Sequence, residues 1–225
     1  MANSKVAVVV PMKPLAVAKG RLEGALTKEA RGALSLLLLE RVLLAARRCP
    51  MVAETLVVGG DSTVADAARR LGATWLDDDG AALNDALWLA FSAAFERGMA
   101  AALYLPHDLP LITPTEITRV IETSGRLSCL VLAPAFRDGG TNAILAPAHL
   151  PLRPSLGAPS FRRHLCSAAA SGYPLALYGS LAIGLDLDTE EDLLLSMERD
   201  PEFANALRRC GIEPAKRLRP THVVQ

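Results

Sequence analysis

Residues 6–10, with the sequence VAVVV, constrain the fold of this chain more than any other segment. Four β-branched residues around one alanine, without polar alternation, are typical of a strand buried on both faces. Such a strand needs helices on both sides of its sheet, as in a parallel or mostly parallel sheet. Pro11 and Pro14 end the run and begin a loop.

The rest of the chain alternates between short apolar runs and longer segments with helical periodicity. We expect further strands near residues 55–58, 73–76, 101–105, 129–133, 141–146, 174–178 and 182–187. We expect helices near residues 27–48, 61–71, 81–97, 114–124 and 160–171, and a final helical region from Thr189. This alternation predicts an α/β fold with helices on both faces of a mostly parallel, mixed sheet. Without a linker or internal repeat, we expect one domain over residues 1–225.

Charge and cysteine content narrow the functional class. The 24 Lys and Arg residues balance 24 Asp and Glu residues, so no basic field is expected to gather nucleic acid or an anionic membrane. Four widely spaced cysteines without a C-x-x-C pair favour reduced thiols in the cytoplasm. The longest apolar stretch, residues 34–46, contains two charged residues and is too short to span a bilayer. We interpret residues 6–10 as a strand and not as a signal peptide, and expect a cytoplasmic protein.

Ligands of open α/β sheets bind beyond the carboxyl ends of the strands, so the loops that follow strands carry the chemistry. The first loop offers Lys13, Lys19 and Arg21 before any acidic residue. Three cations there suit a polyphosphate, although this segment taken alone slightly favours three solvated side chains. This loop lacks the G-x-G-x-x-G pattern of a dinucleotide-binding Rossmann enzyme, and the chain lacks the G-x-x-x-x-G-K-[ST] pattern of P-loop NTPases.

Three carboxylates follow other strands. Asp108 comes after the expected strand 101–105, and Asp186 and Asp188 end another. Two carboxylates at alternate strand positions point to the same side and repel each other unless a cation joins them, or unless the strand has already ended and they face water. Capping of the helix that begins at Thr189 is the alternative, but it leaves one of the two unexplained. If the strands are neighbours, three carboxylates converge, and an all-oxygen set of this kind predicts Mg²⁺.

Six short motifs occur in a fixed order along the chain. They are P-x-K-P-L-x-x-A-K-x-R-L (residues 11–22), L-N-x-A-L (83–87), D-L-P (108–110), G-G-T-N-A (139–143), G-x-x-S-F-x-x-H (157–164) and D-x-D-T-x-x-D-L (186–193). Each alone is weak, but six in order are specific. Over roughly residues 6–195 the chain resembles the phospholactate guanylyltransferase family of deazaflavin coenzyme F-420 biosynthesis.

The resemblance implies a Rossmann-like nucleotidyltransferase fold of the GT-A-like type. It implies transfer of GMP from GTP to a three-carbon phospho-acid (3-phospho-D-glycerate, 2-phospho-L-lactate or phosphoenolpyruvate), with release of pyrophosphate. The product would pass to a downstream coenzyme F-420 synthase. A homodimer is an expectation from base rates alone.

The resemblance also implies roles for individual residues. Asp108, Asp186 and Asp188 would hold Mg²⁺ and, with Lys19, form the catalytic set. Lys13, Lys19 and Arg21 would face the GTP phosphates, and Asn84 would contact the nucleotide. Thr141, Gly157 and Ser160 would hold the phospho-acid, with Ser160 at the start of a helix whose free N–H groups suit an anion.

Three positions depart from the family pattern. Gly20 replaces a serine, Leu156 replaces an aromatic residue, and His107 stands where a small residue is common. A histidine beside Asp108 could bond an extra hydroxyl on the acceptor, so we assign His107 to the substrate site and hypothesise that 3-phosphoglycerate is accepted. His164, one helical turn after Ser160, would either contact the same anion or fix the loop.

Three rival interpretations stay open. A molybdenum-cofactor guanylyl- or cytidylyltransferase, or a sugar-1-phosphate nucleotidyltransferase, would share the fold but usually carries a glycine-rich first loop. A haloacid-dehalogenase-type phosphatase has a similar aspartate pair near the start of its domain, whereas only 37 residues follow Asp188 here. A non-catalytic GTP-binding protein would bind the nucleotide without releasing pyrophosphate.

Overall fold

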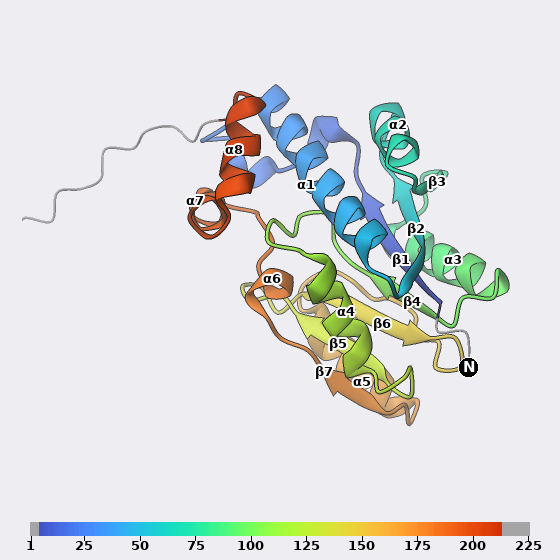
Figure 1. The fold of residues 1–225 in the computed structure, drawn as a ribbon. Helices are drawn as coiled ribbons and strands as arrows, with labels where there is room; N and C mark the ends of the chain where they lie inside the picture. Colours follow the sequence, from blue (N-terminus) through green and yellow to red (C-terminus); the bar gives the residue numbers. More distant parts are fainter. Residues whose placement is uncertain (1–4, 213–225) are drawn as a thin grey trace, which may run out of the picture.

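A computed structural model describes residues 5–212 and contains a seven-stranded sheet with the order β3-β2-β1-β4-β6-β5-β7 (Figure 1). The strands are β1 (Val6–Met12), β2 (Val52–Gly59), β3 (Thr74–Leu76), β4 (Ala101–Tyr104), β5 (Leu130–Pro134), β6 (Thr141–Pro147) and β7 (Leu175–Leu177). Strand β6 runs antiparallel to its neighbours β4 and β5, and the other pairs are parallel. The predicted mostly parallel, mixed sheet is therefore confirmed.

Helices cover both faces of this sheet. They are α1 (Lys28–Arg48), α2 (Ser62–Arg70), α3 (Leu83–Glu96), α4 (Pro114–Thr123), α5 (Ser160–Ala170), α6 (Leu181–Gly184), α7 (Glu190–Arg199) and α8 (Pro201–Arg209), with short 3-10 turns at Leu15–Val17 and Gly20–Leu22. Helices α1, α2 and α4 pack on one face, and α3 and α5 on the other (Figure 1). In β1, Val8 and Val10 enter the first core and Val9 the second, as the unbroken apolar run predicted.

A third apolar cluster ties the C-terminal helices to the first loop. Leu22 of that loop packs with Leu187, with Leu193 of α7 and with Phe203 of α8. In Figure 1, α7 and α8 lie beside one end of α1. This cluster brings the segment that carries Asp188 against the basic loop, although the two are far apart in sequence.

One predicted strand is wrong. Residues 182–187 were expected to be extended, but the structure has the short helix α6, whose cap Ser180 accepts a hydrogen bond from the Ile183 N–H at 3.3 Å. The apolar run did not distinguish the two forms, because its apolar side chains are buried either way. Residues 185–188 then run outside the described sheet, held by a 3.0 Å bond from Leu187 N–H to the Asp108 carbonyl. Asp186 and Asp188 therefore do not lie on one strand face.

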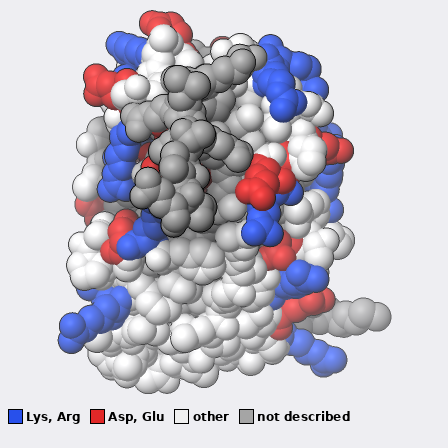
Figure 2. All heavy atoms as spheres, turned by 90° about the vertical axis from the view of Figure 1, so that its left-hand side faces the viewer, with Lys and Arg blue, Asp and Glu red and all other residues white. Residues whose placement is uncertain are grey.

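Two surface properties bear on the expectations above. Figure 2 shows that basic and acidic side chains are interspersed over the upper part of the face it presents, without a broad area of one sign. Among residues 5–212, no helix is long and apolar enough to cross a membrane.

Candidate active site

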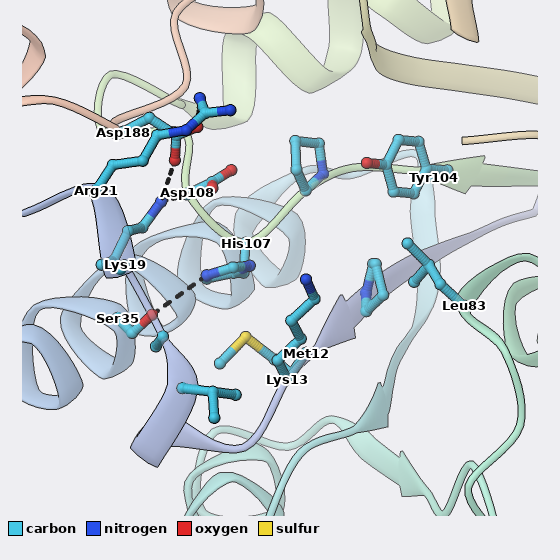
Figure 3. A pocket seen from close by; sticks show the side chains of 15 residues that line it. Met12, Lys13, Lys19, Arg21, Ser35, Leu83, Tyr104, His107, Asp108 and Asp188 are labelled. Carbon is cyan, nitrogen blue, oxygen red and sulfur yellow. Dashed lines mark hydrogen bonds and ion pairs between the residues drawn. The ribbon is translucent and has the colours of Figure 1, made fainter. Parts of the chain in front are cut away.

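A cavity of about 380 Å³ opens beyond the carboxyl ends of β1 and β4, where a parallel sheet is expected to bind ligands (Figure 3). The loop after β1 forms one wall, and the segment after β4 forms another. Charged and polar side chains from these walls, from α1 and from the segment before α7 line it: Lys13, Lys19, Arg21, Ser35, Tyr104, His107, Asp108 and Asp188.

Lys19 lies between two of the predicted carboxylates. Its ammonium is 2.6 Å from Asp108 Oδ2 and 3.3 Å from Asp188 Oδ1, and the side chain is only 3% exposed. The Lys19 backbone is left-handed, with φ 51° and ψ 43°, an uncommon conformation for a residue with a Cβ. Arg21 reaches the other oxygen of Asp188 at 2.9 Å, but this arginine is 68% exposed.

The ion pair with Lys19 fixes the charge of Asp108. Burial alone would raise the pKa of this carboxyl, but the Lys19 ammonium, together with His107, outweighs burial and lowers that pKa to about 2. Burial likewise opposes the charged form of Lys19, and Asp108 and Asp188 more than compensate, so the pKa of Lys19 is raised. Both groups are therefore charged at neutral pH.

Asp186 completes the acidic group. Its Oδ1 accepts a 3.4 Å bond from the Asn142 amide. Burial raises its pKa, and the negative charge of Asp108 and, less strongly, of Asp188 raises it further. Asp186 thus interacts unfavourably with Asp108 and Asp188, and an added cation would relieve that repulsion.

The carboxylate oxygens of Asp108, Asp186 and Asp188 are the type of ligand that a hard cation such as Mg²⁺ prefers. Within the described part of the chain, no three His, Cys, Asp or Glu side chains are already gathered closely enough to hold a metal. Lys19 supplies the positive charge between Asp108 and Asp188 instead.

A second polar cluster lies where β6 meets α5. Thr141 Oγ1 is 3.1 Å from Ser160 Oγ and 2.9 Å from His164 Nδ1, and all three residues are buried. The His164 Nε2 accepts a 2.8 Å bond from the Ser155 N–H. Burial, with the nearby Arg163 charge, lowers the pKa of His164 to about 4, so the ring is neutral. A neutral ring that accepts at Nε2 carries its proton at Nδ1, and His164 therefore donates to Thr141 and fixes the loop.

The structure thus brings two of the predicted acceptor residues together. Ser160 is the first residue of α5, whose cap is Pro159 and not Ser160 itself. Gly157 lies in the loop just before the helix, with φ 103°, a conformation that favours glycine. Its carbonyl accepts a hydrogen bond from Arg163.

Two other predicted site residues have different surroundings from those expected. Asn84 forms two hydrogen bonds with the backbone of Leu156, at 2.7 and 3.3 Å, and so connects α3 to the loop that precedes α5. His107 Nε2 lies 3.3 Å from Ser35 Oγ of α1, and its ring lines the cavity with Lys13 and Lys19 instead of joining Thr141 and Ser160. Burial lowers the pKa of His107 to about 4, so this ring is also neutral.

Three residues near the site had no predicted ligand role. Asn142 is buried, and its amide bonds the Ile183 carbonyl at 2.9 Å as well as Asp186. Asp192 Oδ2 accepts from the N–H groups of Asp188 and Thr189, and its Oδ1 pairs with Arg137 at 2.6 Å. Tyr104 ends β4 and lines the cavity. The sequence signal that could have identified Asn142 is its position as a polar residue inside an apolar run.

The sequence of this chain is similar to those of known proteins. A family model described as "Guanylyl transferase CofC like" matches residues 6–216. The phosphoenolpyruvate guanylyltransferase of Rubrobacter xylanophilus is 40% identical over 82% of this chain and 90% of its own length. The 2-phospho-L-lactate guanylyltransferase of Methanothermobacter thermautotrophicus is 32% identical over 84% of this chain and 82% of its own.

Solved structures support the fold. A candidate nucleotide-diphospho-sugar transferase from Desulfovibrio desulfuricans aligns with a TM-score of 0.73 at 15% identity, covering 94% of this chain and 97% of its own. A CMP-2-keto-3-deoxy-manno-octonic acid synthetase in complex with CTP aligns with a TM-score of 0.58 at 14% identity, covering 92% and 100%. The predicted nucleotidyltransferase fold is therefore confirmed. The family model and the guanylyltransferase relatives show that the chain is a nucleotidyltransferase. The family match and relatives above 30% identity over most of its length show that it belongs to the CofC-like guanylyl transferase family.

Proposed function

We propose that this protein transfers GMP from GTP to the phosphate of phosphoenolpyruvate, or of a closely related three-carbon phospho-acid, and releases pyrophosphate. The observation that carries the proposal is the Lys19–Asp108–Asp188 cluster, which lies within the cavity beside the basic loop. Phosphoenolpyruvate is the first choice because the relative at 40% identity bears that name. The hypothesis of 3-phosphoglycerate depended on His107 near the acceptor and remains a prediction for the assay.

The basic loop is suited to the nucleotide phosphates. Lys13 and Arg21 are exposed at the cavity, where they would pair with the triphosphate, and Lys19 would join them as a buried cation. These charges offset the repulsion between a triphosphate and an anionic acceptor, which is the main barrier to phosphoryl-type transfer. Asp108, Asp186 and Asp188 would hold Mg²⁺, which when bound supplies charge neutralisation and alignment of the phosphates.

The acceptor would bind at the start of α5. The hydroxyls of Thr141 and Ser160, with the free N–H groups of the first turn, make an anion site, and Gly157 allows backbone to approach the ligand. Asn142 follows Thr141 directly and bonds Asp186, so the acceptor strand and the acidic group are adjacent. A phosphate bound there would lie beside the carboxylates.

No general base is needed for this reaction. An acceptor phosphate oxygen is already an anion near neutral pH and attacks the α-phosphorus of GTP directly. The new O–P bond forms as the bond between the α- and β-phosphates breaks, and pyrophosphate leaves in line with the attack. The two buried histidines, His107 and His164, fit this mechanism as neutral groups that position their neighbours.

A pyrophosphate-release assay tests the proposal. Purified protein with Mg²⁺ would be given each of GTP, ATP, CTP and UTP with each of the three phospho-acids. We expect turnover with GTP and phosphoenolpyruvate, and its loss in Asp186→Asn. An Asp66→Asn variant, at an exposed residue of α2, serves as the control and should retain activity. Binding of GTP without release of pyrophosphate in the presence of any acceptor would favour the non-catalytic alternative.

Three finer expectations belong to the same proposal. The 225 residues would form one nucleotidyltransferase domain. The product would pass to a coenzyme F-420 synthase, which an assay coupled to that enzyme would detect. A homodimer is tested by light scattering on the purified chain.

A further inference from the structure

Tyr104 has a hydroxyl group without a hydrogen-bond partner in the part of the chain that the structure describes. The residue is 6% exposed, and it sits between Val9 of β1 and Ile144 of β6 in the sheet. Figure 3 shows its hydroxyl oxygen directed toward the side of the cavity where Asp108 lies. Among residues 5–212, none is hydrogen-bonded to this hydroxyl. The hydroxyl is not among the fully buried, unpartnered polar atoms of the described residues, so it reaches the cavity, where water or a ligand can accept its hydrogen bond.

The surroundings of the hydroxyl indicate the chemistry of that partner. Burial raises the pKa of Tyr104, and the charges of Asp108, Asp186 and Asp138 raise it further, so the phenol keeps its proton and acts as a donor. Asp108 and Asp186 belong to the acidic group. Asp138 lies in the loop between β5 and β6, shortly before Thr141, where its Oδ1 accepts a 2.7 Å bond from the Gly140 N–H. The hydroxyl is therefore close enough to these three carboxylates for their charge to act on it.

We propose that the Tyr104 hydroxyl donates a hydrogen bond to the phosphate of the bound phospho-acid, which makes Tyr104 a further catalytic residue. This inference rests on the proposed function. Thr141 and Ser160 would hold the same phosphate from β6 and α5, and Tyr104 would hold it from β4. Three donors on separate elements fix the direction of the attacking oxygen toward the α-phosphorus.

A neutral donor suits this position better than a cation. A lysine or arginine at position 104 would neutralise the charge of the attacking oxygen and so weaken it as a nucleophile. A phenol orients the phosphate and leaves its negative charge in place. Packing alone does not require the hydroxyl, because phenylalanine would fill the same space between Val9 and Ile144.

Tyr178 provides a matched control. Its hydroxyl donates to Glu116 Oε2 at 2.6 Å and so links the segment after β7 to α4. It does not line the cavity around Asp108. Removing this hydroxyl is expected to lower stability and leave substrate binding unchanged.

The test compares Tyr104→Phe with Tyr178→Phe and wild type. Binding of phosphoenolpyruvate would be measured by calorimetry in the presence of Mg²⁺ and a GTP analogue that cannot be cleaved between the α- and β-phosphates, and turnover by pyrophosphate release. We expect Tyr104→Phe to weaken phosphoenolpyruvate binding roughly ten- to a hundredfold, the usual effect of losing one hydrogen bond to a charged group. Its affinity for the GTP analogue should stay within about twofold of wild type, and turnover with phosphoenolpyruvate should fall at least as much as binding.

The outcomes separate this inference from the proposed function. In one outcome, wild type binds phosphoenolpyruvate, Tyr104→Phe binds it more weakly, and wild type releases no pyrophosphate with any of the three phospho-acids. This outcome would support the inference and contradict guanylyl transfer. Equal phosphoenolpyruvate binding by Tyr104→Phe and wild type would overturn the inference while leaving the proposed function intact. A loss confined to the GTP analogue would also overturn it, because the hydroxyl would then face the nucleotide. Absence of binding of all three phospho-acids in wild type would overturn both.

Discussion

Replacement of Lys19 by methionine is the perturbation whose effect follows most directly from the structure. Methionine keeps much of the length of the side chain but removes the ammonium, which leaves Asp108 and Asp188 without their shared cation. Removing one partner of a buried ion pair typically costs about 3–5 kcal/mol. The two carboxylates are 15% and 28% exposed, so we expect the lower end of that range.

The melting temperature converts this loss into a measurable shift. A chain of this size loses about 2–4 °C per kcal/mol, so a loss of about 3 kcal/mol lowers the melting temperature by roughly 6–12 °C. The measurement belongs at pH 7, where Asp108, with a pKa of about 2, is ionised. The pair stabilises the fold above the unfolded pKa of a carboxyl, near 4, and that contribution is lost as the pH falls through about 2.

Arg21→Met is the matched control for Lys19→Met. Arg21 also pairs with Asp188, but it is 68% exposed, and surface pairs contribute about 0–1 kcal/mol. Mg²⁺ should also raise the melting temperature of Lys19→Met more than that of wild type, because the carboxylates are then free of their internal cation. Equal, small shifts in the two variants would refute the claim that Lys19 is the counter-ion of a buried acidic group.

The remaining predictions concern pH, positioning and the acceptor. His107 and His164 have pKa values of about 4 when folded, below 6.5 when unfolded, so the free energy of unfolding should fall as the pH drops from 6.5 to 4, by roughly 3 kcal/mol per histidine. Urea titrations of wild type and His164→Asn check this, and an unchanged pH slope in the variant would contradict it. Asn142→Ala should lower kcat at least about tenfold with little change in GTP affinity, because Asp186 loses its amide donor; unchanged kcat would remove its positioning role. Thr141→Val should raise the KM for the phospho-acid about tenfold and leave that for GTP unaltered, as initial rates would show.

The fold was largely predictable because its signals are local. The apolar run of β1 predicted a strand buried on both faces, and both cores receive its side chains. Thr27 was predicted to begin a long helix, and its hydroxyl accepts from the Ala30 N–H as the cap of α1. Helix α6 was missed because its cap, Ser180, precedes a run that also suits a buried strand.

The site was less predictable because its contacts join distant segments. Two contacts of the site, His107 with Ser35 and Asn84 with Leu156, each join residues 72 positions apart. No local sequence pattern predicts either contact. The sequence motifs indicated that Lys19 and Asp108 belong to one site, but their direct ion pair depends on the way β1 and β4 lie side by side. Asn142 was visible only as a polar residue in an apolar strand.

We propose above that Asp108, Asp186 and Asp188 hold a divalent cation next to a triphosphate that the basic loop binds. Anomalous scattering from a crystal grown with Mn²⁺ and the GTP analogue tests this most directly. We expect a manganese peak about 2.0–2.3 Å from a carboxylate oxygen of each of the three, with Lys19 turned to the phosphates. Bound analogue with no peak there, and Lys19 still bridging Asp108 and Asp188, would contradict it.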